Sequence, residues 1–311
     1  GNLQIGDILS PAINLAERGF PVSPLTSYFW QSAAKRQLKT ALNGDQLLLD
    51  GNGPNPGQLF KNEGLARTYK LLAEKGKNEF YKGEIASAIV DAIVASGGCL
   101  SLKDLENHHS DWVTPISVDF QNSRMWECPP NGQGLAALIG LNILNQIDLS
   151  STPILSPLRY HYQIEAMRLA FSDAWAFICD PEFSSIPLEW LLSEEYARQR
   201  STLINPVRAN QEVRNGTPPA TSDTVYFCVV DHAGNACSFI NSNYMGFGTG
   251  IVPSGFGFSL QNRGHNFSLV EGHPNQLEPR KRPYHTIIPA MATNPDDNRL
   301  IGPFGVMGGF M

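Results

Sequence analysis

The sequence lacks several features that would each point to a class of protein. No run of residues is long and apolar enough to cross a membrane, and no secretory signal peptide opens the chain. Basic residues are not in surplus, because 23 Lys and Arg stand against 29 Asp and Glu, so nothing indicates nucleic acid as a partner. The content of 42% apolar and 17% charged residues is typical of a soluble globular protein.

Cysteine is scarce and irregularly spaced. The five residues are Cys99, Cys128, Cys179, Cys228 and Cys237. No Cys-x-x-Cys or Cys/His spacing suggests a metal site, so none is expected. Cys228 and Cys237 could face each other across a hairpin. The odd count and scattered positions favour buried reduced thiols over a disulfide, and with them a reducing, cytoplasmic compartment.

Hydrophobic periodicity predicts a chain that mixes helices with strands, and 311 residues suffice for one large domain or two small ones. Helices are expected within residues 1–42 and over 65–75, 85–95, 134–147 and 159–179. Ser101 and Asp104 have the spacing of a capping box that opens a further short helix. Residues 116–120 alternate as a strand.

Residues 224–244 have the pattern of a β-hairpin. The segment 224–230 is rich in β-branched and aromatic residues on both faces, which predicts a strand covered on both sides. Residues 231–235 supply turn chemistry, and 236–240 return as the second strand. The hydroxyl of Thr224 stands where the first strand begins, directly after a polar run that is expected to be a loop.

The motifs around this hairpin resemble the gamma-glutamyltranspeptidase family of N-terminal-nucleophile hydrolases. The family pattern of a Thr, a Val-Asp pair and a Gly-Asn-Ala run is matched by Thr224, Val230-Asp231 and 234–236. Further landmarks lie at 11–23, 80–86, 129–134, 165–171 and 180–183 upstream, and at 246–252, 260–262, 281–283 and 308–309 downstream. The ordered set spans nearly the whole chain, which makes the resemblance specific.

The resemblance implies an α+β fold, a four-layer αββα sandwich that is incomplete in this chain. Residues 1–223 would be part of the large subunit of a precursor, and residues 224–311 part of its small subunit. The chain begins inside what resembles the large subunit and stops just after Gly308-Gly309, so we expect it to be a fragment. The absent signal peptide therefore leaves the localisation open.

In the family, the precursor cuts itself just before a Thr, and the resemblance places this cut at the Asp223–Thr224 bond. A threonine hydroxyl is a weak nucleophile that needs a base. The α-amine freed by cleavage has an ordinary pKa of about 7.7–8.0, so one residue can supply both groups. Taken by itself, Thr224 would more often be an ordinary strand residue, and the surrounding pattern reverses that weighting.

The resemblance also implies roles for the neighbours of Thr224. Ser242 would support the Thr224 amine, and the N–H groups of Gly308 and Gly309 would stabilise the tetrahedral oxyanion. This chemistry requires no metal or organic cofactor. The expected partners are a small-molecule amide substrate and the two subunits of one precursor.

Five substrate-binding positions depart from the pattern of γ-glutamyl-processing members: Tyr244, Arg263, Asn266, His285 and Thr286. Asn266 lacks the charge to pair with the ammonium of glutamate, and Arg263 would oppose it. The variant resembles the family's oxamate-amidohydrolase-like branch and suits a simple anionic acyl group. The basic run 280–282, usually a solvated face, is an alternative site for a substrate carboxylate.

Three functions stay open at this point. The first is a γ-glutamyltransferase or hydrolase that forms an acyl-enzyme from a γ-glutamyl or related acidic amide. The second is an amidase for a small dicarboxylic monoamide such as oxamate. The third is a non-catalytic relative or fragment.

Overall fold

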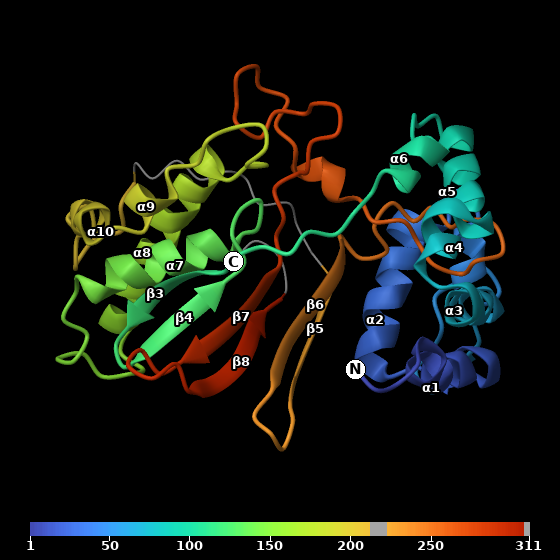
Figure 1. Ribbon diagram of the computed structural model, residues 1–311, viewed down its shortest axis with the longest axis horizontal. Coiled ribbons are helices and arrows are strands. Elements are labelled where there is room, and N and C mark those ends of the chain that lie inside the picture. Colours follow the sequence, from blue (N-terminus) through green and yellow to red (C-terminus); the bar gives the residue numbers. More distant parts are fainter. Residues whose placement is uncertain (212–222, 308–311) are drawn as a thin grey trace. The chain divides into compact units, whose positions relative to one another are not determined.

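The computed structural model describes residues 1–211 and 223–307 (Figure 1). Its chain forms two compact units: Gly1–Asp111 with Met245–Asn262, and Trp112–Tyr244 with Arg263–Met311. The two units are defined by which parts of the folded chain pack together. They do not test the expected boundary between the two subunits at the Asp223–Thr224 bond, which stays a prediction.

Helices dominate the first unit. They are α1 (Ile5–Arg18), α2 (Pro24–Ala33), α3 (Glu63–Lys75), α4 (Lys77–Lys82), α5 (Glu84–Ala95) and α6 (Leu102–Glu106), with a π-helical turn at Ala34–Leu38, a 3-10 turn at Gly44–Leu47 and the short paired strands β1 (Phe20–Pro21) and β2 (Leu59–Phe60). Gly19 ends α1 in a left-handed conformation with φ 85°, and Ser101 forms the predicted capping box with Asp104.

The segment 245–262 is far from residues 1–111 in sequence, yet it completes the core of the first unit. Val252 is fully buried in a cluster with Leu38 and Leu47. The Gln37 side-chain amide donates to the carbonyl oxygens of Met245 and Gly248, at 3.1 and 2.9 Å. Long-range side-chain to backbone bonds of this kind satisfy a segment that has no regular partner strand.

The second unit is built on an antiparallel sheet with the order β3-β4-β7-β8. Its strands are β3 (Ile116–Phe120), β4 (Ser123–Glu127), β7 (Ile288–Thr293) and β8 (Leu300–Val306), and its helices are α7 (Gly134–Asn145), α8 (Pro157–Phe177), α9 (Leu188–Leu191) and α10 (Glu194–Ser201). Helices α7 and α8 lie along one face of this sheet (Figure 1). Their buried aliphatic side chains, among them Leu135, Ile139 and Leu169, form the core of the unit.

The predicted hairpin consists of β5 (Asp223–Val230) and β6 (Ala236–Tyr244), paired so that Thr224 lies opposite Ser242. The hairpin contacts β8, where the Ser238 hydroxyl donates to the carbonyl oxygen of Phe304 at 3.0 Å. The predicted long helices and the 116–120 strand are confirmed with ends within two residues of those expected.

The expectation that the first hairpin strand is covered on both sides is wrong for the described residues. Val225, Phe227 and Val229 are 62, 49 and 56% exposed, and the Phe227 ring stacks on Phe239 of β6 with a centroid distance of 4.8 Å. Side chains alternate along a strand, so an apolar run makes both faces apolar whether or not both are covered.

The cysteines also differ from expectation in part. All five are free thiols, but only Cys179 is buried. The hairpin register places Cys228 opposite Ser238 and Cys237 opposite Val229. Residues offset by one position point to opposite faces of the sheet, so the two thiols do not face each other.

Both regular structure types are present in quantity, which confirms the α+β class. In the part of the chain that the structure describes, no helix combines the length and the apolar character needed to cross a bilayer.

Candidate active site

The candidate nucleophile and its predicted support are adjacent across the hairpin. The hydroxyl of Thr224 donates to the hydroxyl oxygen of Ser242 at 2.9 Å, and the backbone N–H of Tyr244 donates to the same oxygen at 2.9 Å. Both acceptor positions of Ser242 are therefore filled, so its own O–H acts only as a donor. In this uncut chain the contact is with the Thr224 hydroxyl. The predicted support of a free Thr224 amine stays a prediction.

Three parts of the predicted machinery cannot be placed. Gly308 and Gly309, the expected oxyanion donors, lie outside the described residues, as does the side chain of Asp223. The described parts of the chain contain no group of three or more His, Cys, Asp and Glu arranged to hold a metal ion.

Tyr244 ends strand β6 in an unusual conformation. Its φ is 78°, in the left-handed region that bulky residues rarely occupy, and its side chain is 1% exposed. Such a residue stores roughly 1–3 kcal/mol of backbone strain and persists only where its surroundings enforce it. The guanidinium of Arg263 lies 5.4 Å from the centroid of the tyrosine ring, within the range of a cation–π contact.

Arg263 is buried at the start of a 3-10 turn, Arg263–Asn266, and is only 4% exposed. It donates to the Thr286 hydroxyl at 2.9 Å and to the carbonyl oxygen of Ser242 at 3.4 Å. Burial lowers the pKa of Arg263 to about 10. The guanidinium therefore keeps its positive charge at neutral pH, beside the residue that accepts the Thr224 hydroxyl.

His285 is paired through its backbone with the segment 131–133 of the second unit. Its backbone N–H donates to Asn131 at 2.9 Å, and its carbonyl oxygen accepts from Gln133 at 2.8 Å. Burial, with the charge of Arg263 as a second cause, lowers the pKa of His285 to about 3, so its ring is neutral at physiological pH. Neither His285 Nδ1 nor the Tyr244 hydroxyl has a hydrogen-bond partner among the described residues.

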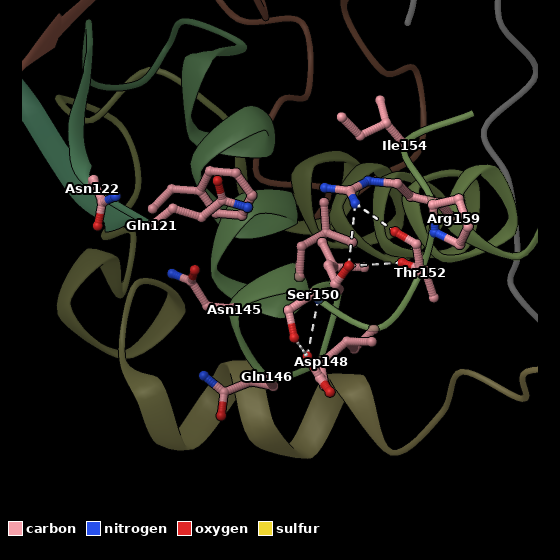
Figure 2. A pocket seen from close by; sticks show the side chains of 14 residues that line it. Gln121, Asn122, Asn145, Gln146, Asp148, Ser150, Thr152, Ile154 and Arg159 are labelled. Carbon is pink, nitrogen blue, oxygen red and sulfur yellow. Dashed lines mark hydrogen bonds between the residues drawn. The ribbon is translucent and has the colours of Figure 1, made fainter. Parts of the chain in front are cut away.

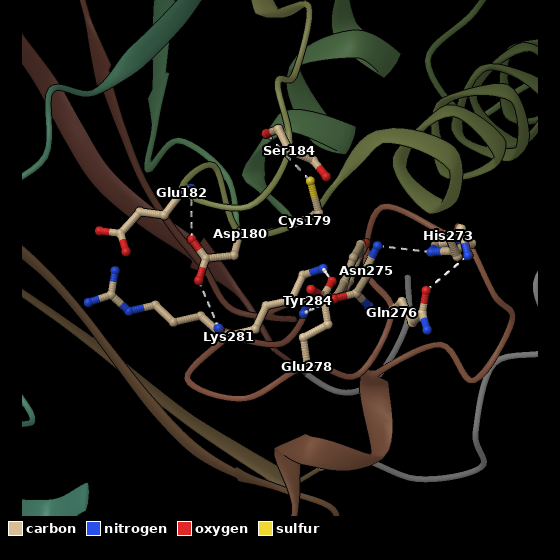
Figure 3. A network of polar contacts seen from close by, with 12 residues as sticks. Cys179, Asp180, Glu182, Ser184, His273, Asn275, Gln276, Glu278, Lys281 and Tyr284 are labelled. Carbon is tan, nitrogen blue, oxygen red and sulfur yellow. Dashed lines mark hydrogen bonds and ion pairs between the residues drawn. The ribbon is translucent and has the colours of Figure 1, made fainter.

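Asn266 performs a structural task in this chain. Its side-chain N–H donates to the carbonyl oxygen of Tyr284 at 3.0 Å, and its own carbonyl accepts from Asn275 at 2.7 Å. Asn275 also accepts from the backbone N–H of Tyr284 at 3.1 Å (Figure 3). These bonds fix the loop that precedes His285. A substrate contact by Asn266 stays a prediction.

The basic run 280–282 is used mainly in packing. Lys281 is buried, pairs with Glu278 at 2.7 Å and lies 5.2 Å from the centroid of the Phe183 ring. The backbone N–H of Arg282 donates to the Asp180 carboxylate at 2.8 Å. Arg280 is exposed. This arrangement favours Arg263 over the basic run as the cation next to Thr224.

Sequence reasoning missed a buried carboxyl group at the end of β4. Glu127 is 4% exposed, and its Oε2 has no hydrogen-bond partner among the described residues. It packs against Gly134, where a Cβ atom would lie only 2.6 Å from Oε2. Burial raises the pKa of Glu127 to about 8. A single Glu in a strand gives no sequence signal for this environment.

A cavity of about 960 Å³ lies elsewhere in the second unit (Figure 2). Its wall is formed mainly by residues 120–122 and 144–154, and it contains none of the predicted site residues. Its polar groups largely satisfy one another: Ser150 donates to Asp148 at 2.5 Å, and Arg159 donates to the carbonyl oxygens of Leu149 and Thr152. Size alone therefore does not identify the site of chemistry here.

The hairpin that begins with Thr224 and the α+β architecture agree with the N-terminal-nucleophile hydrolase fold. The family model for gamma-glutamyltranspeptidase matches residues 1–311, and the chain belongs to that family.

Three relatives illustrate the range of names in the family. The chain is 38% identical to a glutathione hydrolase-like YwrD proenzyme of Bacillus subtilis, over 99% of this chain and 58% of the relative. It is 32% identical to an oxamate amidohydrolase proenzyme of Klebsiella pneumoniae, over 99% of this chain and 57% of the relative. The crystal structure of a cephalosporin acylase from Bacillus halodurans superimposes with a TM-score of 0.88 at 41% identity. The match covers 99% of this chain and 57% of the acylase chain. The chain thus spans little more than half the length of these relatives.

Proposed function

We propose that the complete protein is a threonine amidohydrolase or acyltransferase whose nucleophile is freed by cleavage of the Asp223–Thr224 bond. The observation that carries the proposal is the 2.9 Å hydrogen bond from the Thr224 hydroxyl to Ser242, at the start of the hairpin. The curated relatives are named as proenzymes, which agrees with a precursor that is cut into two subunits.

Self-cleavage and turnover use the same atoms. In the precursor, the Thr224 oxygen attacks the carbonyl carbon of Asp223, the C–N bond breaks, and the nitrogen takes the proton. Water then hydrolyses the ester to a free Asp223 carboxyl group. In the mature enzyme, the Thr224 oxygen attacks a substrate amide while its own amine takes the proton and passes it to the leaving nitrogen. Gly308 and Gly309 stabilise the oxyanion, and water or an amine acceptor releases the acyl group.

The acyl pocket favours a small acid amide. Arg263 brings a buried positive charge, and Tyr244 and His285 bring neutral polar atoms without partners among the described residues. Charge-assisted hydrogen bonds to a carboxylate suit this set, whereas an ammonium group would be repelled by Arg263. We therefore place a dicarboxylic monoamide such as oxamate ahead of γ-glutamyl amides. The name of the YwrD-like relative keeps glutathione as the second candidate.

Denaturing electrophoresis of the full-length gene product tests the cleavage. Within this chain the cut leaves 88 residues after Asp223 (311 − 223), beginning Thr-Val-Tyr-Phe. We expect the Thr224→Ala variant to remain one band and Thr249→Ala, a hydroxyl loss elsewhere, to be cut normally. An uncut wild-type protein would identify a non-catalytic relative and overturn the proposal.

Rates with oxamate and with a γ-glutamyl anilide separate the two substrate classes. We expect the cut enzyme to hydrolyse oxamate with the higher kcat/KM. Efficient turnover of the anilide with none of oxamate would overturn the assignment of the acyl pocket and leave the self-cleavage proposal intact.

A further inference from the structure

The loop between Asn266 and Tyr284 contains a buried asparagine that no step of the proposed chemistry uses. Asn275 is 2% exposed and lies between His273 and Tyr284 (Figure 3). Its backbone N–H donates to Nδ1 of His273 at 3.0 Å, and its backbone carbonyl oxygen accepts from the N–H of Ser268 at 2.9 Å. Its own loop therefore holds Asn275 in place independently of its side chain.

The side chain of Asn275 joins two segments that each supply one part of the acyl pocket. Its Nδ2 donates to the carbonyl oxygen of Asn266 at 2.7 Å, and its Oδ1 accepts from the backbone N–H of Tyr284 at 3.1 Å. Asn266 ends the 3-10 turn that begins with Arg263, and Tyr284 directly precedes His285. All of these residues belong to the second unit, so the connection lies within one compact body.

Both backbone polar groups of Tyr284 are bound by asparagine side chains. Its N–H donates to Asn275, and its carbonyl oxygen accepts from the side chain of Asn266 at 3.0 Å. The next residue, His285, is bonded through its backbone to the segment 131–133 instead. A buried backbone group that loses its partner is costly, so the segment that contains Tyr284 and His285 cannot shift away from Asn275 without a penalty.

We propose that Asn275 is a positioning residue that sets the separation between Arg263 and His285 in the acyl pocket. The inference rests on the proposed function, in which these two side chains receive a small acid amide. Asn275 does not touch the substrate. It holds the two segments at one distance, so that a carboxylate bound by Arg263 also reaches His285. A short substrate needs this fixed spacing because it has little flexibility with which to adapt.

Two substitutions of Asn275 in the full-length protein test the proposal. Asn275→Leu keeps the branched shape and removes both side-chain hydrogen bonds, and we expect KM for oxamate to rise about tenfold while kcat falls less than about threefold. Self-cleavage should stay close to the wild-type rate. Asn275→Ser is milder, because it leaves room for a water molecule that bonds the buried groups without fixing their spacing, and it should raise KM about threefold. A wild-type KM in either variant would overturn the proposal.

Asn142 provides a matched control within the second unit. It is also buried, in helix α7, and its side-chain N–H donates to the carbonyl oxygen of Leu192 at 2.8 Å. Asn142→Leu should lower the thermal unfolding midpoint but leave KM for oxamate unchanged. KM does not depend on how much of the protein is folded, so a loss of folded enzyme cannot imitate the expected result. Equal rises of KM in Asn142→Leu and Asn275→Leu would overturn the proposal.

A double-mutant cycle with Arg263→Lys tests whether Asn275 acts through Arg263. The lysine ammonium lies on a flexible stem and lacks the planar fork, so the spacing of the two segments should matter less. We expect Asn275→Leu to raise KM by less than about threefold in the Arg263→Lys background, and a rise of about tenfold there would overturn the proposal. Failure of the wild-type protein to cut itself would instead contradict the proposed function of Thr224.

Discussion

The guanidinium of Arg263 lies 5.4 Å from the centroid of the Tyr244 ring, and both residues contact Ser242, the acceptor of the Thr224 hydroxyl. A buried positive charge and the candidate nucleophile, the Thr224 hydroxyl, are thus connected through a single residue.

Replacement of Arg263 should separate substrate recognition from self-cleavage. Arg263→Lys keeps the charge but loses the planar fork that stacks on Tyr244 and reaches Thr286. We expect kcat/KM for an anionic amide to fall at least about tenfold in this variant and further in Arg263→Gln, while the precursor still cuts itself. Steady-state kinetics check this. Exposed Arg280→Gln is the control, and an unchanged kcat/KM in Arg263→Lys would contradict the pocket.

Loss of the Ser242 hydroxyl should slow both uses of Thr224. Ser242→Ala removes the acceptor of the Thr224 O–H, and a net hydrogen bond is worth about 0.5–1.5 kcal/mol, so self-cleavage should slow by roughly two- to tenfold. Ser242→Thr keeps a hydroxyl and should recover most of the rate. A time course of the two fragments on denaturing gels measures this. Ser238→Ala, on the same strand, should cut at the wild-type rate.

The sequence predicts the helices of this chain well because their ends are encoded locally. Gly19 ends α1, and Ser101 and Asp104 open α6, as their residue types require. The existence of the β5–β6 hairpin is encoded in the same way, by turn residues between two runs of strand-forming residues. These features depend on residues close together in the chain.

Features that depend on distant packing could not be predicted. The tyrosine at position 244 gives no sign of its positive φ, because bulky residues rarely adopt that conformation. The burial of Glu127 depends on Gly134 at the start of a helix, and the faces of Cys228 and Cys237 depend on the hairpin register. Each needs knowledge of which segments meet.

The exposed apolar side chains of the hairpin should make this chain prone to self-association when it is produced by itself. Val225, Phe227, Val229 and Phe239 are exposed side by side, and apolar clusters of this kind bind dyes and promote association. We expect Phe227→Ser to reduce the fluorescence of a bound apolar dye and the fraction of oligomer in gel filtration. Val94→Thr, at an isolated exposed apolar residue of α5, should change neither. Equal effects of the two substitutions would show that the hairpin face is not the cause.

Glu127 should give the protein a stability that falls as the solution becomes more alkaline. Burial raises its pKa in the folded state to about 8, above the ordinary carboxyl value that holds in the unfolded chain. Between these two values the folded state binds more protons than the unfolded state, so the free energy of unfolding decreases as pH rises. The contribution is complete below the unfolded pKa and is lost by about pH 8.

Titration of His285 changes the free energy of unfolding in the opposite direction, and the pH range of this titration can be avoided. Its folded pKa of about 3 lies below its unfolded value of about 6.5, so its contribution to stability rises with pH between the two and is then constant. Urea unfolding from about pH 6.5 to 8 therefore isolates Glu127. The wild type should lose up to about 2 kcal/mol over that range relative to Glu127→Gln, whose amide cannot ionise. Glu195→Gln, at an exposed site, should follow the wild type. A wild-type slope as flat as that of Glu127→Gln would show that the carboxyl group ionises normally, and therefore that water reaches it.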